Sequence, residues 1–321
     1  MSGLVGHLDG YLAVRRALGF GLARDEKLLR QFCGWLAARG KESFTAADAV
    51  AWAQMPQGAP SWHAWRLSVA RSFARYLVGV GWQADLVPAG LLRGGASRAV
   101  PFIYTDAEIE ALMEACGAVF RDELRRLSMR ALIGLLAVTG ARVGEAIALD
   151  AADFDAAAGT VSLRTSKSGG GRKLPLHPTS TAALEDYLAD TSAITGRRRR
   201  PDESLFLSAA ATRPIYCNVQ NGFHKLTLAC GIAPRGGAKP RLHDLRHAMA
   251  TKTIVRAYQA GEDPGHALAV LSAWLGHAAP AHTYWYVDQS QELLAEAVAK
   301  LENPSPRHAS ALLPERGRRR P

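Results

Sequence analysis

The sequence predicts a mostly α-helical protein with one small β-hairpin or sheet, arranged in two domains. The chain has 321 residues, more than one typical small domain, and 48% of them are hydrophobic, enough for packed cores. Apolar residues recur at three- and four-residue spacing over most of the chain, which is the period of an amphipathic helix. Strand-like runs stand on the two sides of a glycine cluster in GTVSLRTSKSGGGRKLPLHP.

Residues 1–85 are predicted to form an all-helical first domain. Four amphipathic segments follow one another there, and Thr45 with Asp48 gives a capping-box pattern ahead of the third. Gly40 stands where the second of these helices should end. Residues 86–101 are rich in Gly, Pro and Ala without a period, so we interpret them as a linker.

Residues 102–303 are predicted to form the second domain. Helices are expected at about 106–117, after the capping-box pattern TDAE, and at about 122–139. The hairpin follows, and the helical pattern returns from Ser180 onward. The tail 304–321 is rich in Pro and Arg, and we expect it to be basic and flexible.

The charge balance indicates a polyanionic partner. The chain has 39 Lys and Arg against 29 Asp and Glu, a net charge of +10, which favours nucleic acid first and an anionic membrane surface second. No apolar run approaches the ~18 residues of a membrane span, and the first residues lack a signal-peptide pattern. The four cysteines are scattered without a CxxC pair, which indicates reduced thiols and a cytoplasmic protein.

Residues 62–78 are predicted to form a basic amphipathic helix. Arg71 and Arg75 are four residues apart on one face, and Arg66 is close to that face. Two interpretations stay open: a solvated helix surface, or contact of these arginines with a phosphate backbone, which needs several fixed cations. The apolar stripe opposite consists of Trp65, Val69, Phe73 and Leu77.

Two segments contribute a cation each to a possible phosphate site. In TGARVGEAIALD, Arg142 follows a Gly-Ala pair that breaks a helix, and Glu145 stands three residues on, where it could orient the guanidinium. Lys167 stands near the tip of the glycine-bounded hairpin. Glycines allow mobility, and a mobile lysine beside an anionic substrate can deliver a proton.

Two further segments contribute histidines and tyrosines. In RLHDLRHAMAT, the residues His243, Arg246 and His247 share one helical face. The two histidines could be a zinc pair, but no glutamate stands between them as in HExxH, and the arginine would repel a cation. In LGHAAPAHTYWY, His277 is followed by two tyrosines, Tyr284 and Tyr286, which would lie about 200° apart on a helix and cannot face the same chemistry.

One reaction uses all of these groups, the cleavage of a phosphodiester by a phenol. Two guanidiniums can hold the non-bridging oxygens, a phenol can attack phosphorus, and a lysine can protonate the departing 5′-oxygen. Histidines can accept the phenol proton or hydrogen-bond the phosphate. The reaction requires no metal and no cofactor. The predicted catalytic set is Arg142, Lys167, His243, Arg246, His277 and Tyr286.

The four segments resemble, in order and separation, those of the tyrosine recombinases of the phage-integrase type. The matching pieces are TGARVGEAIAL, TSKSGGGRKLPL, HDLRHAMAT and LGHAAPAHTYWY, and four in order are specific where any one is weak. The resemblance covers residues 100–300 as the catalytic domain, and residues 1–85 resemble the core-binding domain of the family. The TYWY variant is similar to that of integrases from bacterial transposons and other mobile elements.

The resemblance implies a site-specific DNA recombinase or integrase that acts through a 3′-phosphotyrosine intermediate. The family nucleophile follows the LGH histidine by nine residues, which makes it Tyr286 and leaves Tyr284 as a packing aromatic. The implied partners are double-stranded DNA, a tetrameric synapse of the chain itself and possible accessory recombination proteins, with no membrane. The apolar stripe within 290–301 is expected to dock on a neighbouring protomer in that synapse.

Two alternatives remain beside this prediction. A type IB topoisomerase would share the cleavage step without pairing specific sites, and the two-domain layout and LGH segment favour the recombinase. A non-catalytic DNA-binding regulator could retain the fold, but pure binding needs no phenol beside two arginines. A covalent adduct with DNA would separate enzyme from regulator.

Overall fold

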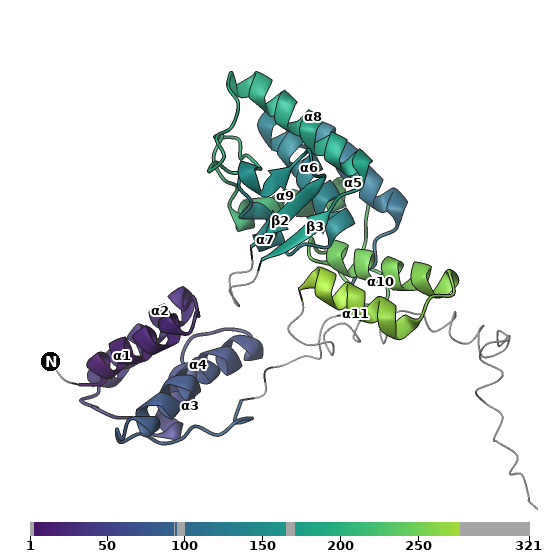
Figure 1. Ribbon diagram of the computed structural model, residues 1–321. Coiled ribbons are helices and arrows are strands. Elements are labelled where there is room, and N and C mark those ends of the chain that lie inside the picture. Colours follow the sequence, from purple (N-terminus) through teal and green to yellow (C-terminus); the bar gives the residue numbers. More distant parts are fainter. Residues whose placement is uncertain (1–2, 93, 95–99, 165–170, 277–321) are drawn as a thin grey trace, which may run out of the picture. The chain divides into compact units, whose positions relative to one another are not determined.

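The computed structural model describes residues 3–92, 94, 100–164 and 171–276. The chain divides into two compact units, the first formed by residues 1–99 and the second beginning at Val100 (Figure 1). The predicted tail 304–321 and the apolar stripe within 290–301 lie outside the described residues.

The first unit is made of the four predicted helices. The predicted capping box is present, because the Thr45 side chain accepts from the backbone N–H of Asp48 while the Asp48 carboxylate accepts from that of Thr45. The second helix ends at Ala37, and Gly40 follows it with a φ of +66°, in the left-handed region that favours glycine. The helices are α1 (Leu4–Ala17), α2 (Ala23–Ala37), α3 (Ala46–Gln54) and α4 (Pro60–Gly79).

Aromatic side chains dominate the core of the first unit. The Phe32 ring lies 4.7 Å from the Trp52 ring and 4.8 Å from the Phe44 ring, distances at which aromatic pairs attract one another. Val87 is buried against this core and Leu92 packs on it. Part of the segment interpreted as a linker is therefore packed against the first unit. Its content of Gly, Pro and Ala indicated a linker, but Val87 and Leu92 within it are apolar and pack on this core.

The position of Arg66 on α4 differs from the prediction. Its side chain is buried, with 4% exposed; Nη2 donates to the Trp52 carbonyl at 2.9 Å, and the guanidinium lies 3.8 Å from the Trp52 ring centre. The expectation that Arg66 lies on the exposed basic face is wrong. Helical spacing explains the error, since residues 66, 70, 73 and 77 share the buried face of α4. Arg71 is half-buried and Arg75 is exposed.

The second unit combines helices with a small antiparallel sheet. The predicted hairpin is present as β2 (Thr160–Leu163) and β3 (Arg172–Pro175), with an unpredicted short strand β1 (Phe154–Asp155) beside β2. The predicted capping box at Thr105 is also present. The described helices are α5 (Asp106–Val119), α6 (Glu123–Thr139), α7 (Val143–Ile147), α8 (Pro178–Thr195), α9 (Tyr216–Ala229), α10 (Asp244–Gln259) and α11 (Pro264–Leu275), with a 3₁₀ turn at Ala151–Asp153.

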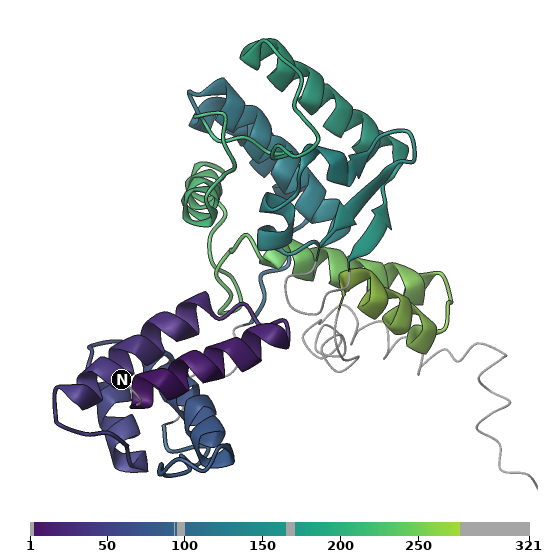
Figure 2. The same cartoon turned by 60° about the vertical axis from the view of Figure 1, so that its left-hand side comes forward.

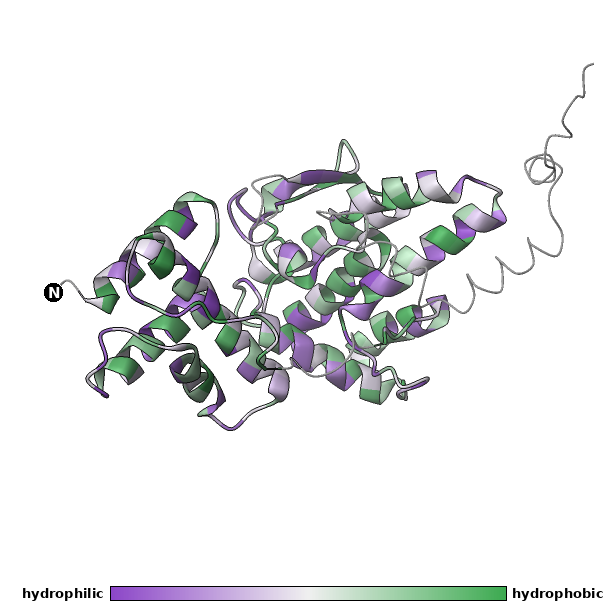
Figure 3. Ribbon diagram, turned by 90° about the horizontal axis from the view of Figure 1, so that it is seen from below, coloured by the Kyte–Doolittle hydropathy of each residue, from purple (hydrophilic) through white to green (hydrophobic). Residues whose placement is uncertain are grey.

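The packing of α10 decides where the functional groups meet. It packs against α6 on one side and against α11 on the other, and α10 and α11 run side by side in both views (Figures 1 and 2). Along these helices, and along those of the first unit, hydrophobic and hydrophilic residues are interspersed as amphipathic helices require (Figure 3). The predicted fold class, mostly helical with a small sheet, is confirmed.

Candidate active site

The junction between α6 and α7 places Arg142. Helix α6 ends at Thr139, and the C-cap residue Gly140 that follows has a φ of +60°. A Cβ at this position would lie 2.5 Å from Met249 Cε and 3.0 Å from Leu275 Cδ2, so both side chains would have to shift, and the left-handed φ would strain any residue other than glycine. Arg142 then occupies the N-cap position of α7. The predicted break between the two helices is confirmed.

Glu145 holds two arginines at once. Arg142 Nη1 donates to Glu145 Oε1 at 2.8 Å, and Arg172 Nη2 donates to Oε2 at 2.8 Å. The Glu145 side chain is only 9% exposed. Burial raises its pKa, but the hydrogen bonds from Arg172 and then Arg142 outweigh burial and lower the pKa to about 2. The predicted orientation of Arg142 by Glu145 is present in the structure.

Sequence reasoning missed Arg172. It stands opposite Leu163 in the β2–β3 register, and Leu163 and Leu174 both point into the core. Directly opposed residues share a face of a sheet, so Arg172 lies on the buried face, and its side chain is 12% exposed. The alternation of Arg172 with Leu174 was the signal that could have identified it.

Three arginines meet at the C-terminal end of α11. The last carbonyls of a helix lack intrahelical partners and carry partial negative charge, so guanidiniums are suited to them. The three donors come from the sheet, from α10 and from the α6–α7 junction. The hydrogen bonds are Arg172 Nε to Trp274 O at 2.8 Å, Arg246 Nη2 to Leu275 O at 2.7 Å, and Arg142 Nη2 to Gly276 O at 3.4 Å.

Helix α10 contributes Arg246 and the two histidines. Arg246 is 3% exposed, and its Nη1 also donates to the Gly140 carbonyl at 2.6 Å. His243 stands at the N-cap position with an exposed edge, and its ring meets that of the buried His247 edge to face at 5.1 Å. Partial burial lowers the pKa of His243, and the charges of Arg246, Arg241 and Arg142 lower it further against the opposing effect of Asp244. These effects favour the neutral imidazole over the charged one.

The structure thus brings together Arg142, His243 and Arg246 of the predicted set. The other three predicted residues, Lys167, His277 and Tyr286, lie outside the described residues, as does Tyr284. Gly276, to which Arg142 donates, immediately precedes His277 in the sequence, and Leu163 and Arg172 stand on the two sides of the segment that contains Lys167.

No group of three or more His, Cys, Asp or Glu able to hold a metal ion occurs within the part of the chain that the structure describes. Over the same residues, no helix has the length and apolar character needed to cross a bilayer.

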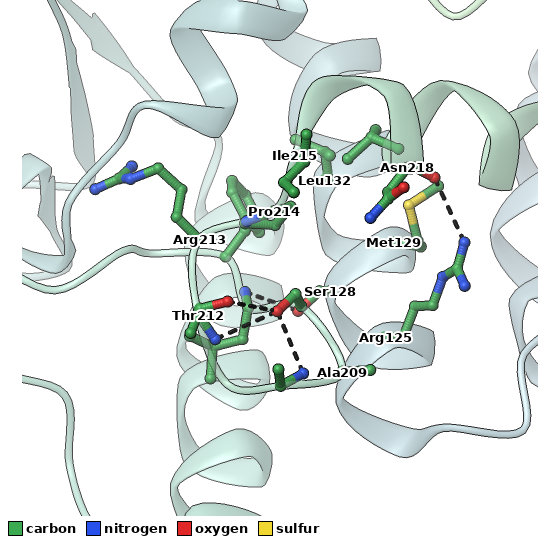
Figure 4. A pocket seen from close by; sticks show the side chains of 15 residues that line it. Arg125, Ser128, Met129, Leu132, Ala209, Thr212, Arg213, Pro214, Ile215 and Asn218 are labelled. Carbon is green, nitrogen blue, oxygen red and sulfur yellow. Dashed lines mark hydrogen bonds between the residues drawn. The ribbon is translucent and has the colours of Figure 1, made fainter.

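A separate cavity of about 300 Å³ lies between α6, the loop before α9 and the start of α9. Figure 4 shows Arg125 and Arg213 on opposite sides of it, around apolar residues such as Met129 and Leu132. Arg142, His243 and Arg246 do not line it. This cavity is distinct from the candidate active site.

The chain is similar to known proteins over most of its length. Residues 103–292 match the phage integrase family. The protein y4rB of Sinorhizobium fredii (strain NBRC 101917 / NGR234), named as an integrase/recombinase, is 38% identical over 307 residues, which cover 91% of this chain and 95% of that protein.

Two solved structures are similar in fold. The integrase of the Tn1549 transposon, in complex with transposon right end DNA, is 15% identical and matches with a TM-score of 0.62 over 94% of this chain and 99% of that one. The lambda integrase tetramer bound to a Holliday junction is 20% identical and matches with a TM-score of 0.56 over 88% of this chain and 77% of that one.

The family match and the relative that spans the whole chain show the class of protein, an enzyme that breaks and rejoins DNA. The chain belongs to the phage integrase family and is a site-specific recombinase of the tyrosine type. The resemblance drawn from the four sequence segments is confirmed.

Proposed function

We propose that the protein cleaves duplex DNA at a specific site through a covalent 3′-phosphotyrosine on Tyr286 and then rejoins the strands. The observation that supports this most is the meeting of Arg142 and Arg246 at the carbonyls of residues 275 and 276. Two segments more than 100 residues apart in the sequence thereby hold cations at the point where the LGH segment begins. The reaction needs fixed cations beside the attacking phenol.

The two arginines are proposed to hold the non-bridging oxygens of the scissile phosphate. Their positions are set by Glu145 and by backbone carbonyls before any DNA arrives, so little reorganisation is needed as negative charge develops on phosphorus. Low exposure around Arg246 strengthens each electrostatic contact relative to water. Arg142, which is 42% exposed, is the donor that the incoming phosphate meets first.

The proposed step forms one bond and breaks one. Tyr286 Oη attacks phosphorus, the bond from phosphorus to the 5′-oxygen breaks, and Lys167 gives a proton to that oxygen. His243 accepts the phenol proton, because its lowered pKa favours the unprotonated ring that can take up a proton, and His277 hydrogen-bonds the phosphate. Attack of a 5′-hydroxyl on the phosphotyrosine reverses the step and rejoins the strand.

The first unit is proposed to contact the DNA backbone through α4. Arg71 and Arg75 are on its accessible side. Arg66 is buried and donates to the Trp52 carbonyl, so it is not part of this proposal. The lambda integrase tetramer on a Holliday junction supports a tetrameric synapse, in which residues 290–301 would dock on a neighbouring protomer. With DNA as substrate, the proposed location is the cytoplasm, and the proposed task is the movement of a mobile element, with accessory proteins where direction must be set.

A nicked suicide substrate tests the proposal. Cleavage near the nick releases a short fragment and traps the protein on DNA, so an enzyme gives a covalent adduct and a regulator gives none. Duplex DNA selected from a randomised pool by the full-length protein supplies the site. Relaxation of plasmids that lack the selected site, at the rate seen with the site, would favour a topoisomerase instead.

A further inference from the structure

The residues just before α10 place a further arginine beside His243. Arg241 and His243 are exposed, whereas Leu242 between them and Asp244 after them are buried. The charge of Arg241 is close enough to act on the His243 imidazole. The sequence motifs did not identify Arg241, because one arginine among 39 Lys and Arg residues does not stand out by sequence alone.

A buried carboxylate fixes the Arg241 guanidinium. Asp244 is 0% exposed, and its Oδ2 accepts from Arg241 Nε at 3.0 Å and from Arg241 N at 3.1 Å, while its Oδ1 accepts from Nη2 at 2.8 Å. The Tyr104 hydroxyl donates to the Arg241 carbonyl at 3.2 Å. Backbone and side chain are thus both anchored, so the arginine loses little conformational freedom on binding a ligand.

The anchored guanidinium still has donors to offer. A guanidinium carries five N–H groups, and Asp244 takes two, one on Nε and one on Nη2. The remaining donors lie on the Nη1 and Nη2 end, and the side chain is 43% exposed although its carboxylate partner is fully buried. The exposed part of the pair therefore belongs to Arg241, whose charge acts on the His243 imidazole.

We propose that Arg241 is a further DNA-contacting residue of this site, and that it donates to the phosphate next to the scissile one on the cleaved strand. The inference rests on the proposed function. Arg241 is tied to Asp244 and not to the carbonyls of residues 275 and 276 where Arg142 and Arg246 meet, which places it outside the pair that holds the scissile phosphate. An exposed, pre-oriented arginine near His243 is suited to bind a neighbouring phosphate.

Binding measurements with single neutral phosphates test this contact. The protein carries Tyr286→Phe so that binding is at equilibrium, and each selected duplex carries one methylphosphonate at or beside the scissile position. For the protein that retains Arg241, a methylphosphonate at one adjacent position should weaken DNA binding about tenfold or more. For Arg241→Gln, the same methylphosphonate should not weaken binding any further, because the contact is already lost. Arg241→Gln should also lower the slope of log K against log salt by about 1.

Two variants separate contact from structural support. Arg121→Gln removes one exposed cation from the same unit and should retain the full methylphosphonate effect. Arg241→Lys keeps the charge and should recover the salt slope, whereas a purely structural ion pair would give Lys and Gln variants the slope of the parent protein. If the losses in affinity caused by Arg241→Gln and by the methylphosphonate were additive at every adjacent phosphate, while the protein with Tyr286 still formed the adduct, this inference would be overturned and the proposed function would stand. Absence of any adduct would refute the proposed function and this inference with it.

Discussion

Arg66 in the first unit and Arg246 in the second are both almost completely buried, yet their surroundings differ. Arg66 lies over the Trp52 ring and donates to one carbonyl of the same helical bundle. Arg246 donates to carbonyls of two separate segments, with Arg142 donating to the next carbonyl along the chain. Burial of an arginine therefore does not by itself mark a functional site. The proposed site is distinguished by the convergence of several cations from distant segments.

The two arginines also differ in what they do for the fold. Arg66 fills space in an aromatic core, where its guanidinium attracts the ring face and burial lowers its pKa. The arginines of the second unit are oriented by Glu145 and by the end of α11, so their positions are fixed relative to one another. The first arrangement packs a guanidinium into a domain core, and the second is the one that we propose binds a phosphate.

The largest contrast is expected in the chemistry. Arg246→Ala and Arg142→Ala should each lower single-turnover cleavage about 10²–10³-fold while binding changes little, because each removes a preorganised donor to the developing charge. Arg66→Met should lower the melting temperature and leave the cleavage rate unchanged at temperatures where the protein is folded. An effect of tenfold or less for Arg142 and Arg246 would place the phosphate elsewhere.

The role of Lys167 can be isolated by changing the leaving group. If the lysine protonates the 5′-oxygen, Lys167→Ala should be slow on ordinary DNA and should recover on a 5′-bridging phosphorothiolate, whose sulfur leaves without a proton. The measurement is the ratio of the two cleavage rates in variant and parent. Equal defects on both substrates would assign the lysine to binding.

The buried Glu145 predicts a pH dependence of stability. Its pKa in the folded protein is about 2, below the ordinary value of 4.5, so it stabilises the fold above about pH 4.5 and loses that contribution as pH falls toward 2. The shift corresponds to about 3 kcal/mol at neutral pH. Glu145→Gln should be less stable than the parent at pH 7, and the difference should shrink on acidification in denaturant titrations. A constant difference from pH 7 to pH 3 would contradict this.

The smallest effects are expected on the accessible side of α4. Arg71→Gln and Arg75→Gln should each reduce the salt slope of DNA binding by about 1 if each contacts one phosphate. Arg66→Met should leave that slope unchanged, because its guanidinium is held in the core. A reduced slope in Arg66→Met alone would reverse the assignment of these three arginines.

The sequence predicted the features that depend on local pattern. Helical spacing located the four helices of the first unit and α5 and α6 of the second, and the Thr45–Asp48 capping box is present as expected. Helical spacing also places Arg66 on the face of residues 70, 73 and 77, which is buried, although the charge of an arginine favours the surface.

Contacts between distant segments were beyond sequence reasoning. Arg172 meets Glu145 only because the β3 register and the α6–α7 junction bring them together, and no local pattern specifies that distance. The ion pair between Arg241 and Asp244 joins residues three apart in the sequence. How firmly it fixes the guanidinium depends on the burial of Asp244, which cannot be inferred from the sequence. The assignments of Lys167, His277 and Tyr286 stay predictions, since these residues lie outside the described part of the chain.

The most direct test of the account compares two phenylalanine variants on the nicked suicide substrate. Tyr286→Phe removes only the nucleophilic oxygen, and Tyr284→Phe is a matched control in the same segment. We expect Tyr286→Phe to bind the duplex normally and form no covalent adduct, while Tyr284→Phe forms the adduct. An adduct with Tyr286→Phe and its loss with Tyr284→Phe would contradict the account.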